Sequence, residues 1–223
     1  MPASAFAHFR HWVFDLDNTL YPPSAALFDQ IEVRMIAYVM RELGVDHDRA
    51  NHLRASYWAQ HGTTLAGLMA HHDVDPVPYL AEVHDISFDD LTPDPVLADR
   101  IAALPGRRIV FTNGDVAYAQ NVLEARELGA TFDAVYGVEE TGFIPKPEAP
   151  AFEAIFGLDG TDPASAAMFE DDPRNLAVPH ALGMQCVLVG QAEPADHIHH
   201  QTTDLTDFLT RVAPPPGGAG GGA

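Results

Sequence analysis

The chain has 223 residues, and its hydrophobic content of 47% excludes wholesale disorder and allows a substantial buried core. Twelve lysines and arginines stand against 32 aspartates and glutamates, so the net charge is −20, which disfavours partners such as nucleic-acid polymers and anionic membranes. The single cysteine, Cys186, excludes an intramolecular disulfide and a cysteine-based zinc cage, and no apolar run reaches the roughly 18 residues of a membrane span.

The start of the chain, MPASAFAHFRH, lacks the basic start and long apolar stretch of a signal peptide, so we expect a cytoplasmic location. A buried strand is predicted at His11–Asp15, where a short run of apolar residues leads into a polar segment. In an extended segment, residues i and i+2 point the same way. Asp15 and Asp17 therefore share one side of the chain, while Leu16 faces the core.

The segment from Ser24 to about Asp90 shows helical spacing and no convincing strand. Apolar residues between Leu27 and Met40 recur at helical intervals, with Ser24 expected as the N-cap and Gly44 as the stop. Further helices are predicted at residues 48–60, 65–71 and 77–84. This pattern predicts an all-helical insertion that lies as a cap over the sheet.

The second half alternates between strands and helices. Strands are predicted at residues 108–112, 134–137, 166–170 and 186–189, and helices at 95–104, 115–128, 148–156 and 173–182. Such alternation indicates an α/β fold, with a Rossmann-like parallel sheet, helices on both faces, and the small helical cap inserted after the first strand. We expect residues 1–21 and 91–213 to form the core domain, 22–90 the cap, and the Pro/Gly/Ala-rich segment 214–223 a disordered tail.

Polar residues follow several of these strands, at the edge where open parallel sheets bind ligands. Asp15 and Asp17 follow the first strand, Thr112 and Asn113 end the second, and Asp171 follows the fourth. The only lysine in the chain, Lys146, lies between two prolines after the third strand, whereas the other eleven basic residues are arginines.

These residue types together suit phosphoryl transfer. Neighbouring carboxylates repel one another unless a cation lies between them, and a hard ion with oxygen ligands, Mg²⁺ most naturally, resolves that repulsion. Thr112 offers a hydroxyl, Asn113 offers an amide at a helix start, and Lys146 offers a compact positive charge beside a phosphate. Together these residues suit attack of a carboxylate on a phosphoryl group. The attack gives an aspartyl-phosphate, which water then hydrolyses.

The ordered set Asp15-x-Asp17-x-Thr19, Thr112, Lys146 and Glu170-Asp171-Asp172 resembles the four motifs of the haloacid dehalogenase-like hydrolase superfamily. The helical insertion is similar to the cap of its first subfamily. The string from Asp15 to Pro22, DLDNTLYP, and the segment FEDDPRN resemble the pyrimidine 5′-nucleotidase group. The resemblance covers roughly residues 10–190.

The resemblance implies a role for each matched position. Asp15 would be the nucleophile and a Mg²⁺ ligand. Asp17 would bind Mg²⁺ through its backbone carbonyl and act as the general acid and base. Thr112 and Lys146 would hold the phosphoryl group, with Asn113 as a further substrate contact, and Asp171 would complete the metal site. The role of Glu170, where many members have glycine, stays open.

The implied function is a Mg²⁺-dependent phosphatase acting on a small phosphate monoester, with a pyrimidine nucleoside 5′-monophosphate such as UMP or CMP favoured. A sugar-phosphate phosphatase or a phosphomutase stays open, as does a phosphate-binding regulatory module that has lost catalysis. Asp17 argues against dehalogenation, and the lack of a lysine in the cap argues against phosphonate cleavage. Oligomeric state cannot be inferred from the sequence.

The remaining aromatic and histidine residues favour structural roles. Tyr57, Trp58 and His61 have a spacing that suits packing within the cap, although they could also line its inner surface and stack on a base. His71–His72 ends a predicted helix, where an imidazolium suits the helix dipole. The tract Asp196–His200 is expected to be a surface loop rather than a metal site.

Overall fold

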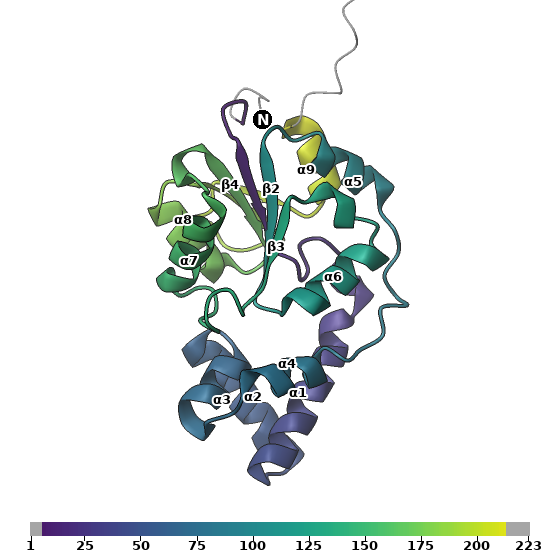
Figure 1. Cartoon of the computed structure of the whole chain (residues 1–223), viewed down its shortest axis with the longest axis vertical. Helices are drawn as coiled ribbons and strands as arrows, with labels where there is room; N and C mark the ends of the chain where they lie inside the picture. Colours follow the sequence, from purple (N-terminus) through teal and green to yellow (C-terminus); the bar gives the residue numbers. More distant parts are fainter. Residues whose placement is uncertain (1–5, 213–223) are drawn as a thin grey trace, which may run out of the picture.

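The computed structural model describes residues 6–212 (Figure 1). One six-stranded sheet has the order β3-β2-β1-β4-β5-β6, and every neighbouring pair in it is parallel. The strands are β1 (His11–Phe14), β2 (Arg107–Phe111), β3 (Ala134–Tyr136), β4 (Ala166–Glu170), β5 (Gln185–Val189) and β6 (His200–Thr202). The predicted α/β fold with a Rossmann-like parallel sheet is confirmed.

Helices cover both faces of this sheet because its strands are apolar on both sides (Figure 1). Trp12 and Phe14 of β1 pack in the core beneath α5 (Pro95–Ala102), α6 (Val116–Ala125) and α9 (Leu205–Val212). Val13 points the other way, into a second core beneath α7 (Ala149–Asp159) and α8 (Ala177–Ala181). Stacking of Phe14 on Phe169, with ring centroids 4.6 Å apart, holds the ends of β1 and β4 in register.

The helical insertion forms a separate layer below the sheet in Figure 1. It consists of α1 (Leu27–Leu43), α2 (His47–His61), α3 (Thr64–His72) and α4 (Pro76–Val83), which pack on one another. Gly44 ends α1 as expected, with a left-handed φ of 64°. The expectation that Ser24 caps this helix is wrong. Ser24 lies inside a 3-10 turn, Pro23–Ala25, and left-handed Ala26 is the residue before α1.

Elements near the C-terminal end differ most from the sequence prediction. The predicted helix 173–182 is a 3-10 turn, Pro173–Leu176, followed by the short helix α8, and a proline opens the turn. Two further 3-10 turns, Gly129–Thr131 and Pro163–Ser165, lie in connections. The expected loop Asp196–His200 is wrong at its end, because His200 begins β6 and pairs with β5. A three-residue edge strand is too short to produce a period in the sequence.

The division into a core of residues 1–21 and 91–213 and a cap of 22–90 stays a prediction. The predicted tail, 214–223, lies outside the described residues. None of the helices within residues 6–212 has the length and apolar character needed to span a lipid bilayer.

Candidate active site

A cavity of about 460 Å³ lies between the cap and the carboxyl ends of the strands. Its floor includes residues that follow β1 and β4, among them Asp15, Asp17 and Asp171. The chain runs from β1 to β2 on one side and returns to β4 on the other, so the cavity opens at the switch point of the sheet. Apolar cap side chains form much of its opposite wall: Phe28, Ile31, Met35, Leu65, Leu80 and Val83.

Lys146 lies at the centre of the buried charges below this cavity. Its Nζ donates to Asp15 Oδ1 at 2.6 Å, to Glu170 Oε2 at 2.8 Å and to the Phe111 carbonyl oxygen at 2.9 Å. All three ammonium hydrogens therefore have acceptors. The side chain of Lys146 is fully buried, so it can neutralise charge at this point without being exposed to solvent.

The protonation states of Asp15, Asp171 and Lys146 follow from their burial and from the excess of carboxylates around them. Burial, and then the Glu170 charge, raise the pKa of Asp15 to about 7, although Lys146 opposes the shift. The pKa of Asp171 is raised to about 9, again by burial first and then by the charges of Asp15 and Glu170. Burial alone would lower the pKa of Lys146, but the two carboxylates raise it, so the lysine stays charged. One lysine therefore does not balance the local negative charge.

The backbone of Lys146 is fixed by Asn113. The Asn113 side chain accepts from the Lys146 amide at 2.8 Å and donates to the Lys146 carbonyl oxygen at 3.1 Å. The neighbouring Thr112 hydroxyl accepts from the Gly114 amide at 2.9 Å. Asn113 and Gly114 line the cavity, whereas Thr112 and Lys146 are fully buried behind the lining. The expected phosphate-holding role of Thr112 and Lys146 stays a prediction.

Two tyrosines hold the side chain of Asp17. Its Oδ1 accepts from the hydroxyls of Tyr21 and Tyr118, each at 2.6 Å. Distances this short are typical of hydrogen bonds to a carboxylate. Because two donors occupy Oδ1, a proton that Asp17 takes up is directed to Oδ2, for which no hydrogen bond is found within residues 6–212. Burial first, and then the Asp15 charge, raise the pKa of Asp17. The sequence prediction missed both tyrosines.

Three carboxylates fit a hard divalent cation. Asp15, Glu170 and Asp171 each place an oxygen within 4.8 Å of the others. Asp15 Oδ2 is buried and lacks a hydrogen-bond partner, and oxygen ligands of this kind suit Mg²⁺. The sequence prediction included Asp15 and Asp171 and left Glu170 open. The carboxylate of Asp17 faces the tyrosines instead, so its expected contribution through the backbone carbonyl stays a prediction.

Glu170 has two defined hydrogen bonds. One oxygen accepts from Lys146, and the other accepts from the Asp172 amide at 3.2 Å. The Glu170 side chain is 1% exposed, so this carboxylate is part of the buried charge network and has almost no contact with solvent.

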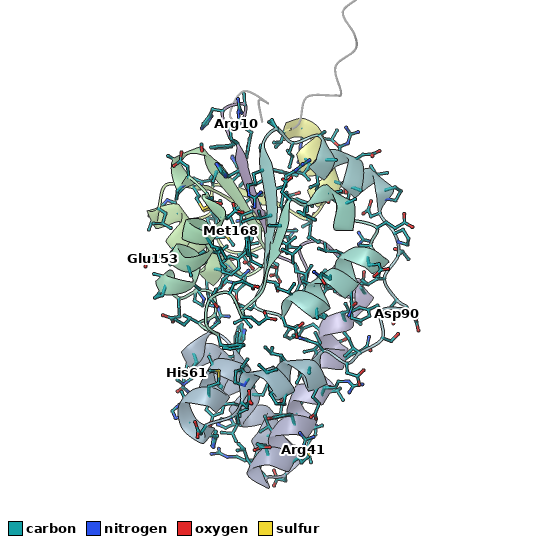
Figure 2. The ribbon with its side chains drawn as sticks, in the orientation of Figure 1. Arg10, Arg41, His61, Asp90, Glu153 and Met168 are labelled. Atoms are coloured by element: carbon teal, nitrogen blue, oxygen red, sulfur yellow. The ribbon has the colours of Figure 1, made fainter. Side chains whose placement is uncertain are left out.

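The cap contacts the core at the mouth of the cavity through Trp58. The guanidinium of Arg174 lies 3.7 Å from the centroid of the Trp58 ring, and Arg174 also pairs with Asp172 at 2.6 Å. Beside it, a Cβ at Gly62 would lie 2.9 Å from the Lys146 carbonyl oxygen, so only glycine fits there. Figure 2 accordingly places His61 at the end of α2 that faces the sheet, and Arg41 at the far end of the cap.

The prediction that the cap aromatics pack internally is confirmed for Tyr57 and wrong for Trp58. Tyr57 is buried and hydrogen-bonds His72 at 2.6 Å. Trp58 is 46% exposed and lines the cavity, because neighbouring positions on a helix face different directions. His61 lies 3.0 Å from His71, nitrogen to nitrogen, within the cap.

The model of the family described as haloacid dehalogenase-like hydrolases matches residues 9–183. Phosphate metabolism protein 8 of Saccharomyces cerevisiae is 27% identical over an alignment of 191 residues, and the match covers 78% of this chain and 60% of that protein. The chain thus spans about three fifths of the length of this curated relative.

Two solved structures share the fold. The HAD phosphatase from Thermococcus onnurineus has a TM-score of 0.59 at 18% identity, covering 92% of this chain and 100% of that one. The 2-haloacid dehalogenase from Pseudomonas syringae pv. Tomato DC3000 has a TM-score of 0.56 at 19% identity, covering 92% and 98%. One fold therefore carries both named activities, and the chemistry must be argued from the site.

Proposed function

This chain belongs to the haloacid dehalogenase-like hydrolase family, and from that premise we propose that it is a Mg²⁺-dependent phosphatase of small phosphate monoesters. The observation that carries the proposal is the state of Asp15. One of its oxygens is held by Lys146, the other has no hydrogen-bond partner within residues 6–212, and the residue lines the cavity. A carboxylate that lines the cavity and is held by a lysine can act as the nucleophile toward a phosphorus atom bound there.

The proposed reaction has two steps. A carboxylate oxygen of Asp15 attacks phosphorus, the bond from phosphorus to the ester oxygen breaks, and Asp17 gives its proton to the departing alkoxide. Water then attacks the phosphorus of the aspartyl-phosphate and Asp17 takes the proton from that water. The bond from phosphorus to the Asp15 oxygen breaks, so inorganic phosphate leaves and the Asp15 carboxylate is restored. The two tyrosines on Oδ1 leave Oδ2 of Asp17 for both transfers. General acid–base catalysis of this kind contributes about 10²–10⁴-fold.

Mg²⁺ would be held by Asp15 and Asp171, together with the backbone carbonyl of Asp17, and Glu170 completes the acidic cluster. When bound, it supplies positive charge that offsets the carboxylates and the phosphate. Lys146 adds its charge on the other side of Asp15. Thr112 and Asn113 complete the proposed phosphoryl site, Thr112 by the hydroxyl and Asn113 by fixing the lysine backbone.

A pyrimidine nucleoside 5′-monophosphate is the proposed substrate. The cavity has a volume suited to a small molecule, an apolar wall, and the exposed Trp58 ring at its mouth, which offers a surface for a planar base. The similarity of the DLDNTLYP string to pyrimidine 5′-nucleotidases supports the same choice, and the likeness to a phosphate metabolism protein supports phosphate chemistry.

Phosphate release from a panel of monoesters tests the proposal. The panel contains UMP, CMP, AMP, glucose 6-phosphate and glycerol 3-phosphate, each assayed with Mg²⁺ and with a chelator. We expect turnover only with Mg²⁺ and the largest specificity constant for UMP or CMP. Preference for a sugar phosphate would overturn the substrate and keep the chemistry. Halide release from 2-chloropropionate without phosphatase activity would overturn both.

A further inference from the structure

Both chain segments that join the cap to the core contact the side chain of Asp17, directly or through one residue. Tyr21 lies just before the cap and donates to Asp17 Oδ1. His84 lies just after α4, at the end of the cap, and its ring stacks on Tyr118, with centroids 4.3 Å apart and planes 15° apart. Tyr118 in turn donates to the same Asp17 oxygen at 2.6 Å. Figure 1 shows α4 and α6 next to each other at this point.

His84 is itself fixed to the core. Its Nδ1 lies 2.6 Å from Asp115 Oδ2, and both side chains are about nine-tenths buried. Asp115 caps α6 through Oδ1, which accepts from the Tyr118 amide at 2.6 Å. Burial alone would raise the pKa of Asp115, but the hydrogen bond and charge of His84 lower it, so Asp115 is an acceptor and Nδ1 is the donor. Asp115 thereby connects the cap histidine to the helix that carries Tyr118.

We propose that His84 is a positioning residue through which the closed cap fixes Tyr118 and so orients Asp17 for proton transfer. The inference rests on the proposed acid and base role of Asp17. When the cap lies over the sheet, His84 covers one face of the Tyr118 ring and limits its rotation. The Tyr118 hydroxyl then stays on Oδ1, and Oδ2 faces the leaving group. Asp17 is therefore oriented for proton transfer only when the cap is closed, and the same closure shields the bound substrate from bulk water.

Leaving-group dependence separates this role from a structural one. Phenyl phosphate and 4-nitrophenyl phosphate have the same shape near phosphorus, but only the phenolate of the first needs protonation to depart readily. His84→Ala is expected to lower kcat for phenyl phosphate about tenfold and kcat for 4-nitrophenyl phosphate less than about twofold. His84→Phe, which keeps a stacked ring, should recover part of the loss. His52→Ala, at an exposed histidine of α2, is the matched control.

Tyr118→Phe removes only a hydroxyl and tests the same connection without disturbing the packing. It should show the same preference for the activated ester, and adding His84→Ala to it should cause little further loss, because both changes act on one connection. Equal losses on both esters, or additive losses in the double variant, would overturn the inference and leave the phosphatase intact. Wild-type protein that releases phosphate neither from these esters nor from UMP with Mg²⁺ would overturn the proposed function as well.

Discussion

The two sides of the cavity are built differently. On the sheet side, Asp15, Lys146 and Glu170 are held by short hydrogen bonds among fully buried atoms. On the cap side, Trp58 is half exposed and meets the core through one contact with a guanidinium that is itself partly exposed. The reacting groups are thus fixed by the fold, and we expect the part of the cap around Trp58 to be the more mobile wall. Fixed geometry favours catalysis, and a movable wall allows substrate entry.

The largest effect is expected from the sheet side. Asp15→Asn replaces the proposed nucleophile with an amide of nearly the same shape, so phosphate release should fall by on the order of 10³-fold or more. The thermal midpoint should not fall, because the change removes one of the mutually repelling buried carboxylates. Steady-state kinetics and calorimetry check both statements. Asp99→Asn, at an exposed position of α5, is the control, and variant activity above one tenth of wild type would contradict the assignment.

Lys146→Met tests the difference between the two sides of the cavity by its effect on the free energy of unfolding. The change leaves Asp15 and Glu170 buried without their cation, and breaking a buried ion pair in this way costs about 3–5 kcal/mol. Denaturant unfolding measures the loss. Arg41→Met, which breaks an exposed pair with Glu82 in the cap, should leave the unfolding midpoint nearly unchanged. Similar losses of unfolding free energy in the two variants would show that the buried charges on the sheet side contribute no more to stability than the exposed ion pair in the cap.

Magnesium should stabilise the protein in a pH-dependent way. Folding raises the pKa of Asp15 to about 7 and of Asp171 to about 9, chiefly by burial, so the folded state holds protons that the unfolded chain has lost. Stability without metal therefore falls as the pH rises from about 4 toward 9. Because Mg²⁺ competes with those protons, it should raise the thermal midpoint more at about pH 8.5 than at about pH 6.

Asp171→Asn provides the control for the magnesium prediction. The variant removes the carboxyl with the higher pKa, so the fall in stability with pH should become shallower and the Mg²⁺ shift should shrink. Thermal unfolding at both pH values measures it. An unchanged Mg²⁺ shift in this variant would place the ion elsewhere.

The smallest effect is expected on the cap side. Trp58→Leu removes the contact with Arg174, and a cation–π contact at an exposed site contributes about 0.5–1 kcal/mol, which corresponds to about a 2–5-fold change in KM. The change should be larger for UMP than for 4-nitrophenyl phosphate if the ring contacts the base. Val77→Ala, at an exposed apolar position of α4, is the control. A large loss of kcat would mean that Trp58 also orders the sheet side.

Sequence reasoning located the parts of the site that strands and short motifs define. Asp15, Asp17 and Asp171 follow apolar strands, and a parallel sheet brings such ends to one edge. It missed Tyr21, Tyr118 and His84. Tyr118 reaches Asp17 from α6, 101 residues along the chain, and His84 reaches Tyr118 only because the cap packs on the core. Tyr21 was within the string used for the family resemblance, and its position four residues after Asp17 was the one available signal.

The sequence by itself determined the alternation of strands and helices, the helical insertion, and the acidic residues at the strand ends. These features are local, because apolar periodicity and the ends of strands depend on residues that are close together in the chain. Only the tertiary structure decided that Lys146 bridges two carboxylates, that Glu170 is one of them, and that Trp58 faces the cavity. Those contacts join residues far apart in the chain, and no local pattern encodes them. The order of strands in the sheet brings Lys146 to Asp15 and Glu170, and the packing of the cap on the sheet brings Trp58 to Arg174.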